Sequence, residues 1–180
     1  MSIEVATLRS PIGTVAIGVR GGRLLRLELG WDPSRLRQDL VRRFEDAAFE
    51  DSPDPGGIVS CLARYFEGEL GAIDSVAVDP GGTPFQHQVW LALRRIPAGR
   101  TWTYAELARA VGRPAAVRAV GAANGANPIA LVLPCHRVIG SNGRLTGYGG
   151  GLDRKEWLLR HEGASFVPEP SLPLLKAMEG

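Results

Sequence analysis

The first thirty residues alternate between apolar and polar positions in three short stretches. They read EVATL, TVAIGV and LLRLEL, and the turn residues Ser10-Pro11 with Gly13 and then Gly21-Gly22 separate them. A period of two that is broken by turn residues is typical of short antiparallel strands. The pattern therefore predicts that the chain begins with a small sheet.

Two helical patterns and a further strand follow the sheet. Ser34 is the expected N-cap of a helix whose apolar face carries Leu36, Leu40, Val41 and Phe44. After the breaker run DSPDPGG, a second helix places Ile58, Leu62, Tyr65 and Phe66 on one face, and SVAVD over 75–79 predicts another strand. Cys61, inside the second helix, is interpreted as a small core residue. Pro80-Gly81-Gly82 is the expected end of an N-terminal α+β domain that spans residues 1–80.

The next part of the chain is predicted to be mostly helical. Thr83 and Pro84 form an N-cap and first residue, and the T-x-x-E pattern from Thr103 to Glu106 is a capping box that starts a second helix. Gly112 ends that helix, and Pro114 is expected to begin another, with Val117, Val120 and Gly121 facing inward and Ala115, Ala119, Ala122 and Ala123 facing outward. Two short helices joined by such a turn indicate a helix-turn-helix. Trp31, Trp90, Trp102 and Trp157 are read as packing residues, and His87 and His161 as structural or exposed ones.

Charge is distributed unevenly along the 180 residues. Residues 1–84 hold 9 arginines against 13 acidic residues, whereas residues 85–160 hold 11 basic residues against 3 acidic ones. A concentrated positive charge suits a phosphate backbone, although a solvated basic face explains it equally well. The start of the chain has no signal-peptide pattern and no long apolar run, so we expect a cytoplasmic protein that does not bind membranes. The two cysteines, Cys61 and Cys135, are expected to remain thiols.

Cys135 follows the apolar run IALVL, which is expected to be a buried strand, and it lies within the sequence PCHRV. A cysteine reacts as its thiolate, so it needs a base or a positive charge nearby, and His136 and Arg137 are the adjacent candidates. Neighbours in an extended segment point to opposite sides, so the two side chains need not both reach the thiol. Taken alone, a Cys-His pair is more often structural than catalytic.

The surroundings of this pair resemble a known family. PCHRV, preceded by the Arg-Ala-Val-Gly helix and Asn-Pro and followed by Tyr-Gly-Gly-Gly, is similar to the O6-alkylguanine-DNA alkyltransferases, and the similarity runs from Thr83 to Gly163. The resemblance implies an α+β fold, with a small antiparallel sheet in a ribonuclease-H-like N-terminal domain. A mostly helical, winged-helix-like domain would follow over 83–166, with a tail over 167–180. The implied activity is the irreversible transfer of an alkyl group from guanine, and from the O4 atom of thymine, to the protein.

The resemblance also implies a role for particular residues. Cys135 would accept the alkyl group, and His136, oriented by Glu162, would take its proton through a water molecule. Asn127 is similar to the family's hinge residue, Tyr104 to the tyrosine beside the target nucleotide, and Arg118 to the finger that replaces the flipped base. The remaining expected DNA contacts are Ala116, Ala119, Thr103 and Arg113. The expected substrate pocket consists of Tyr148, Gly149, Gly150, Val138 and Pro134.

The chain departs from the family pattern at Gly149, where many relatives have a serine that contacts the substituted oxygen. The expected partner is double-stranded DNA with alkylated bases, bound by a monomer that needs no cofactor, no metal and no protein partner. Its place would be the cytoplasm, or the nucleus in a eukaryote. Two alternatives are a helix-turn-helix protein that senses lesions or regulates transcription, and a thiol hydrolase that uses the same three residues and regenerates its thiol.

Overall fold

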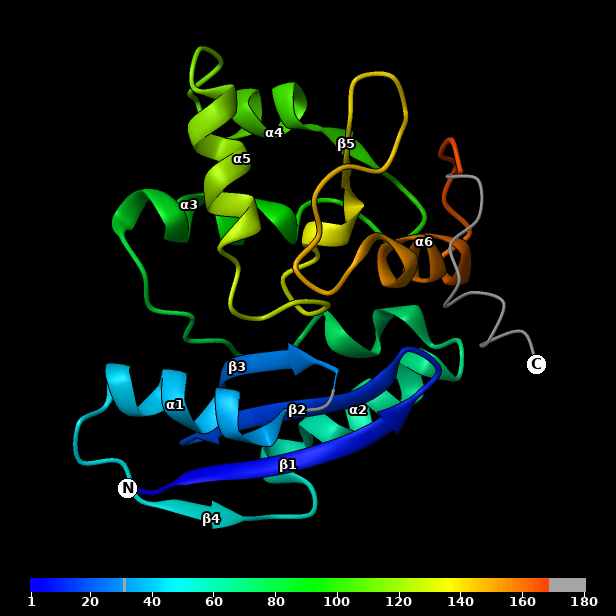
Figure 1. Cartoon of the computed structure of the whole chain (residues 1–180). Helices are drawn as coiled ribbons and strands as arrows, with labels where there is room; N and C mark the ends of the chain where they lie inside the picture. The colour runs from blue at the N-terminus through cyan, green and yellow to red at the C-terminus, as the bar shows by residue number, and fades with distance from the viewer. Residues whose placement is uncertain (31, 169–180) are drawn as a thin grey trace. The chain divides into compact units, whose positions relative to one another are not determined.

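The computed structural model describes residues 1–30 and 32–168, which form two compact units (Figure 1). Unit 1 comprises Met1–Gly81 together with Pro128–Val132, and unit 2 comprises Gly82–Asn127 and the chain from Leu133 onward. The contacts therefore divide beside Pro80-Gly81-Gly82, and a short later segment joins the first unit. The domain limits expected above stay a prediction. Trp31 and most of the expected tail lie outside the described residues.

Unit 1 is built on a four-stranded sheet with the order β3-β2-β1-β4. The strands β1 (Ile3–Ser10), β2 (Gly13–Arg20) and β3 (Arg23–Leu29) are antiparallel neighbours, which confirms the three strands predicted from the alternation. The short strand β4 (Phe49–Asp51) pairs in parallel with β1 and was not predicted. Its three residues show no alternation to detect, because the pairing depends on a distant strand.

Helix α1 (Pro33–Arg43) packs against one face of this sheet, and its apolar residues Leu36 and Leu40 join a core with residues of all three long strands. A Cβ atom on Gly18 would lie 2.5 Å from Leu40 Cδ1, so any other residue there would force the Leu40 side chain to shift. Helix α2 (Ile58–Phe66) contacts β1. The 3-10 turns η1 (Pro55–Gly57) and η2 (Leu70–Ile73) flank α2.

Unit 2 contains four helices among the described residues: α3 (Pro84–Leu93), α4 (Tyr104–Ala110), α5 (Val117–Gly125) and α6 (Leu152–His161). The strands β5 (Trp102–Thr103) and β6 (Val138–Ile139) form a two-residue parallel pair, and the 3-10 turn η3 (Cys135–Arg137) precedes β6. Helices α3, α4 and α5 pack against one another (Figure 1). The predicted caps are confirmed, because Thr83 and Thr103 each accept a hydrogen bond from the third residue of their helix.

Several local predictions are wrong. Asp32 rather than Ser34 caps α1, because its carboxylate accepts hydrogen bonds from two backbone N–H groups of the first turn. The run 129–133 is not a strand: it forms turns, with Leu131 in the left-handed region at φ 72°. The segment 75–79 contributes only an isolated bridge at Val78. A buried apolar run has no periodicity, so it cannot distinguish a strand from buried turns.

The predictions of which residues are buried were wrong at four positions. Val41 and Val117 are exposed, whereas Ala123, expected to face outward, is buried and its carbonyl accepts a hydrogen bond from Trp90 Nε1 at 2.7 Å. Helix α5 begins at Val117 rather than at Pro114, because residues 113–116 form a turn, and this later start changes which positions face inward. Cys61 is half-buried rather than a core residue, and Arg64 Nη2 donates to its sulfur at 3.6 Å.

The α+β fold class is confirmed by these elements. No helix within residues 1–30 and 32–168 is long and apolar enough to cross a membrane.

Candidate functional site

Cys135 is the first residue of the turn η3, and its side chain is buried with 7% of the residue exposed. Two backbone hydrogen bonds shape this turn, from Cys135 N to Leu133 O at 2.8 Å and from Arg137 N to Pro134 O at 3.0 Å. The prediction that the thiol follows an extended strand is therefore wrong. A 3-10 turn has three residues per turn, so the alternation of side chains in an extended strand does not apply to Cys135, His136 and Arg137.

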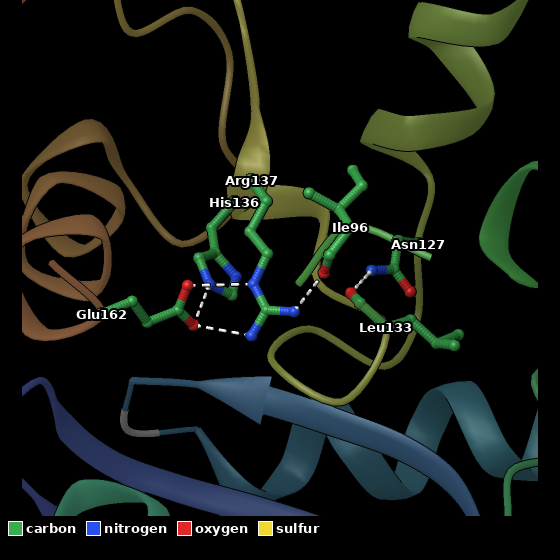
Figure 2. Close-up of polar contacts among 6 residues, drawn as sticks. All are labelled: Ile96, Asn127, Leu133, His136, Arg137 and Glu162. Atoms are coloured by element: carbon green, nitrogen blue, oxygen red, sulfur yellow. Dashed lines mark hydrogen bonds and ion pairs between the residues drawn. The ribbon is translucent and has the colours of Figure 1, made fainter. Parts of the chain in front are cut away.

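His136 and Arg137 both point to the carboxylate of Glu162, the residue that caps the C-terminus of α6 (Figure 2). His136 Nε2 lies 2.7 Å from Glu162 Oε1, and Arg137 donates to both oxygens at 2.9 Å. Arg137 also donates from Nη1 to the carbonyl of Ile96 at 2.7 Å. All three side chains are almost completely buried, so the turn, the end of α6 and the segment after α3 are joined by one polar cluster.

The cluster fixes the proton positions. Burial alone would raise the pKa of Glu162, but its contacts with His136 and Arg137 outweigh burial and hold this pKa well below its usual range. Burial lowers the pKa of His136, although Glu162 opposes this, so the ring is neutral near pH 7. A neutral ring beside an ionised carboxylate donates its Nε2–H to that carboxylate. Nδ1 then carries a free electron pair, and it has no hydrogen-bond partner among residues 1–30 and 32–168.

Asn127 lies just after α5, and its Nδ2 atom donates to Leu133 O at 2.7 Å. This bond holds the end of α5 to the residues that lead into Cys135, as Figure 2 shows. Burial raises the pKa of the Cys135 thiol, while a hydrogen bond with Asn127 and the charge of Lys155 act in the opposite direction. The thiol is therefore protonated at rest, and it needs a base to react.

The loop between β6 and α6 carries the expected pocket residues. The Tyr104 hydroxyl donates weakly to Thr146 O at 3.4 Å and accepts from Thr146 Oγ1 at 3.1 Å. The Tyr148 hydroxyl is buried without a hydrogen-bond partner among the described residues. Burial raises its pKa well above the usual value, and the charge of Cys135 acts in the same direction.

The other expected pocket residues lie beside the Cys135 turn or in the loop before α6. Pro134 and Val138 are buried on either side of η3, and Gly149 is exposed. Gly150 is half-buried, and its carbonyl accepts a hydrogen bond from Arg154 Nη1 at 2.8 Å. A Cβ atom on Gly149 would meet nothing within 4 Å, so a serine would fit there without a clash.

The expected DNA contacts lie on and around α4 and α5. Arg118 and Ala119 are exposed in the first turn of α5, and Ala116 is its half-buried N-cap. Arg113 is exposed in the turn before α5, with its guanidinium carbon 5.8 Å from the centre of the Phe85 ring. Thr103 uses its hydroxyl as the cap of α4, so its side chain is already engaged.

Lys155 is the functional candidate that the sequence reading missed. This α6 residue is fully buried, and its Nζ atom donates to Val138 O at 2.6 Å and to Thr146 O at 2.8 Å. Its helix carries the pattern DRKEW, in which a lysine normally faces solvent. Only the packing of α6 against η3 places this ammonium inside the unit.

The structure thus joins His136 and Glu162 in one buried cluster, and half-buried Asn127 contacts the segment that leads into the buried Cys135. Among the expected DNA contacts, Arg113, Arg118 and Ala119 are exposed, whereas Thr103, Tyr104 and Ala116 are half-buried. No group of three or more histidine, cysteine, aspartate or glutamate residues in the described parts of the chain could hold a metal ion.

Comparisons with known proteins define the class to which this unit belongs. Residues 84–164 match the family described as 6-O-methylguanine DNA methyltransferase, DNA binding domain. The chain is 54% identical over 143 residues to the methylated-DNA–protein-cysteine methyltransferase of Salmonella typhimurium, covering 78% of this chain and 84% of that one. It is 46% identical over 163 residues to the protein of the same name from Mycobacterium tuberculosis, covering 89% and 92%.

Solved structures agree with the sequence relatives. The Mycobacterium tuberculosis protein called OGT, in complex with DNA, matches with a TM-score of 0.75 and 43% identity over 89% of this chain and 92% of that one. The O6-methylguanine-DNA methyltransferase of Pyrococcus kodakaraensis matches with a TM-score of 0.63 and 26% identity, over 90% and 99%. The chain belongs to the family of methylated-DNA–protein-cysteine methyltransferases.

Proposed function

We propose that this protein repairs DNA directly by transferring an alkyl group from the O6 atom of guanine to the sulfur of Cys135. The observation that carries the proposal is the buried contact of 2.7 Å between His136 Nε2 and Glu162 Oε1, next to the Cys135 turn. It leaves Nδ1 of a neutral His136 as the base. Family membership supports the same reaction, because the relatives are named for a cysteine that receives a methyl group from DNA.

The reaction begins when the alkylated base leaves the duplex, because a buried thiol cannot reach an atom inside the stack. The proton of Cys135 passes through a bridging water molecule to His136 Nδ1, and the Glu162 carboxylate stabilises the imidazolium that forms. The thiolate then attacks the alkyl carbon. A sulfur–carbon bond forms, the carbon–O6 bond breaks, and guanine leaves as an anion that takes up one proton. The thioether product is stable, so each protein molecule acts once.

The exposed surface of α4 and α5 is the proposed DNA interface. The relative from Mycobacterium tuberculosis was solved in complex with DNA, and the excess of basic residues over 85–160 suits a phosphate backbone. In this interface Arg118 would occupy the space of the flipped base, because it is the long side chain in an exposed first turn next to Ala119. Thr103, Arg113 and Ala116 would contact the backbone around it.

The finer expectations belong to the same proposal. Unit 2 would dock as a winged-helix-like module, unit 1 would have the ribonuclease-H-like topology of the family, and the protein would act as a monomer. Tyr104, Tyr148 and the glycines at 149 and 150 would surround the flipped base, which could also be an O4-alkylated thymine. The protein would act where the genomic DNA is, in the cytoplasm or, in a eukaryote, in the nucleus.

Intact-mass measurement tests the proposal. The protein is mixed with an excess of duplex DNA that contains O6-methylguanine, and we expect its mass to rise by one methyl group. Cys135→Ser should show no increase, whereas Cys61→Ser, which changes the half-buried second cysteine, should behave as the native protein does. Repaired guanine with unmodified protein would indicate a hydrolase, and tight binding to the lesion without repair would indicate a sensor.

A further inference from the structure

The fully buried ammonium of Lys155 has no part in the reaction outlined above. Its two hydrogen bonds join the residue that follows the Cys135 turn, Val138, to Thr146 in the loop that carries Tyr148. The ammonium thus links the Cys135 turn to the loop of the proposed pocket. The two carbonyls take two of its three N–H groups.

A buried charge of this kind is expensive for a protein to keep. No carboxylate in residues 1–30 and 32–168 forms a salt bridge with Lys155. Among those residues, its ammonium is stabilised by hydrogen bonds to two backbone carbonyl groups alone. Burial of an ammonium without a counter-ion normally destabilises a fold. A neutral side chain would fill the same space without that cost. The charge is therefore expected to have a partner at some stage of the reaction.

Cys135 is the group that can become this partner. Burial lowers the pKa of Lys155 to about 8, and the charge of Cys135 opposes the decrease. Reciprocally, the charge of Lys155 opposes the rise that burial causes in the pKa of Cys135. Lys155 also lowers the pKa of His136, which helps to keep that ring neutral. The other titratable groups close to this pair are Tyr148 and, through His136, Glu162 and Arg137.

We infer that Lys155 is a positioning residue whose ammonium supports the Cys135 turn and serves as the counter-ion of the acceptor thiolate. The inference rests on the proposed function, since it assigns the thiolate that this function requires. At rest the ammonium is held by two carbonyls, and when Cys135 gives up its proton the two charges form a buried ion pair. The pair stabilises the thiolate once it forms and disappears when the thioether forms.

The decisive experiment measures the pH dependence of Cys135 reactivity without DNA. The proteins carry Cys61→Ser, and alkylation of Cys135 by iodoacetamide is followed by peptide mass spectrometry from pH 5 to 10. Lys155→Met should raise the midpoint of the pH dependence of Cys135 alkylation by about one pH unit or more. It should also slow alkylation at pH 7 about tenfold. Lys155→Arg, which keeps the charge, should have a midpoint close to that of the native protein. If both variants are slower and neither midpoint moves, Lys155 is only structural and the inference is wrong.

A second measurement does not depend on how well Lys155→Met folds. The chain has only two lysines, Lys155 and Lys176, so the ¹³Cε signals of labelled lysine can be followed individually through a titration. Because the coupling of two sites is reciprocal, Cys135→Ala should lower the titration midpoint of Lys155 and leave that of Lys176 unchanged. Identical Lys155 midpoints in the two proteins would overturn the inference.

The two proposals fail separately. A native protein that gains no methyl group from DNA, but whose iodoacetamide midpoint shifts with Lys155→Met, would refute the repair function and leave the counter-ion role intact. If the native protein is methylated but Lys155→Met leaves the midpoint of iodoacetamide alkylation unchanged, the repair function stands and the counter-ion role is refuted.

Discussion

The two units of this protein differ in what they bury. In unit 1 the buried side chains of the described residues are apolar, and its ion pairs, such as Arg43 with Asp79, lie at the surface. Unit 2 buries a histidine, an arginine, a lysine and two glutamates as well as its apolar core. These five residues all lie between 136 and 162.

This difference separates a unit that is organised for stability from one that is organised for chemistry. Apolar burial stabilises a fold without demanding exact geometry. A buried ionisable group, in contrast, needs a partner, because without one its pKa shifts and the group becomes neutral. A cluster of such groups is therefore retained where it performs a reaction. Mutations in unit 1 should consequently affect stability alone, whereas mutations in the polar cluster of unit 2 should affect both stability and activity.

The largest effect is expected for Glu162→Gln. This change leaves Arg137 as a buried cation without a counter-ion, so the free energy of unfolding should fall by about 3–5 kcal/mol. It also removes the carboxylate that stabilises protonated His136, so single-turnover transfer should slow at least ~100-fold. Urea unfolding and the rate of methyl transfer measure the two effects. A stable, active variant would show that the polar cluster is not the functional centre.

A core truncation in unit 1 should separate stability from activity. Leu62 is fully buried in α2, and Leu62→Ala should lower the free energy of unfolding by about 2–5 kcal/mol. At a temperature at which the variant is folded, its transfer rate should remain within about twofold of the native rate, because no reacting group changes. A large loss of rate in folded protein would contradict the division of roles.

The third effect is a pH dependence that originates in unit 2. Because burial lowers the pKa of His136 in the native state, the unfolded chain binds a proton below about pH 6.5 that the folded protein does not. The free energy of unfolding should therefore decrease as the pH falls below about 6.5, by at most about 1.4 kcal/mol per pH unit. Denaturant titrations from pH 7 to 5 measure this slope. His136→Gln should reduce it, whereas His87→Gln, at an exposed position, should leave it unchanged.

The smallest effect is expected for Asp79→Asn in unit 1. Its carboxylate is 2.6 Å from Arg43 Nη2, a pair that is as close as those in unit 2, but both side chains are partly exposed. Solvent screening should limit the loss of unfolding free energy to below about 1 kcal/mol. Set beside Glu162→Gln, this variant tests whether burial, and not distance, determines the importance of an arginine–carboxylate pair. Equal losses in the two variants would mean that burial is not decisive.

Elements defined by neighbouring residues could be predicted from the sequence. The three alternating strands and the capped starts of α3 and α4 are correct, because side-chain alternation and hydrogen bonds between N-cap and N3 depend on residues a few positions apart. The chemistry of PCHRV was also recognisable, and the residues expected to act with Cys135 include His136 and Glu162, which the structure joins.

Elements that depend on distant residues were predicted poorly. The run 129–133 reads as a strand but forms turns, and its bridge from Ile129 to Leu27 shows that a remote segment determines its backbone. Arg137 was considered as a positive charge beside the thiol, yet it turns to Glu162, 25 residues further along the chain. Its direction follows from the 3-10 turn and from the end of α6, and neither is visible in the local pattern.

The sequence by itself therefore determined the three antiparallel strands of unit 1, the capped starts of α3 and α4 and the identity of the reactive thiol, since each is a matter of residue type and short spacing. Only the tertiary structure decided which charges are buried together. In the sequence, Lys155 lies among charged residues that normally face solvent. In the structure, the packing of α6 places its ammonium between the carbonyl groups of Val138 and Thr146. Burial is a property of the folded chain, and burial is what gives these charges their strength.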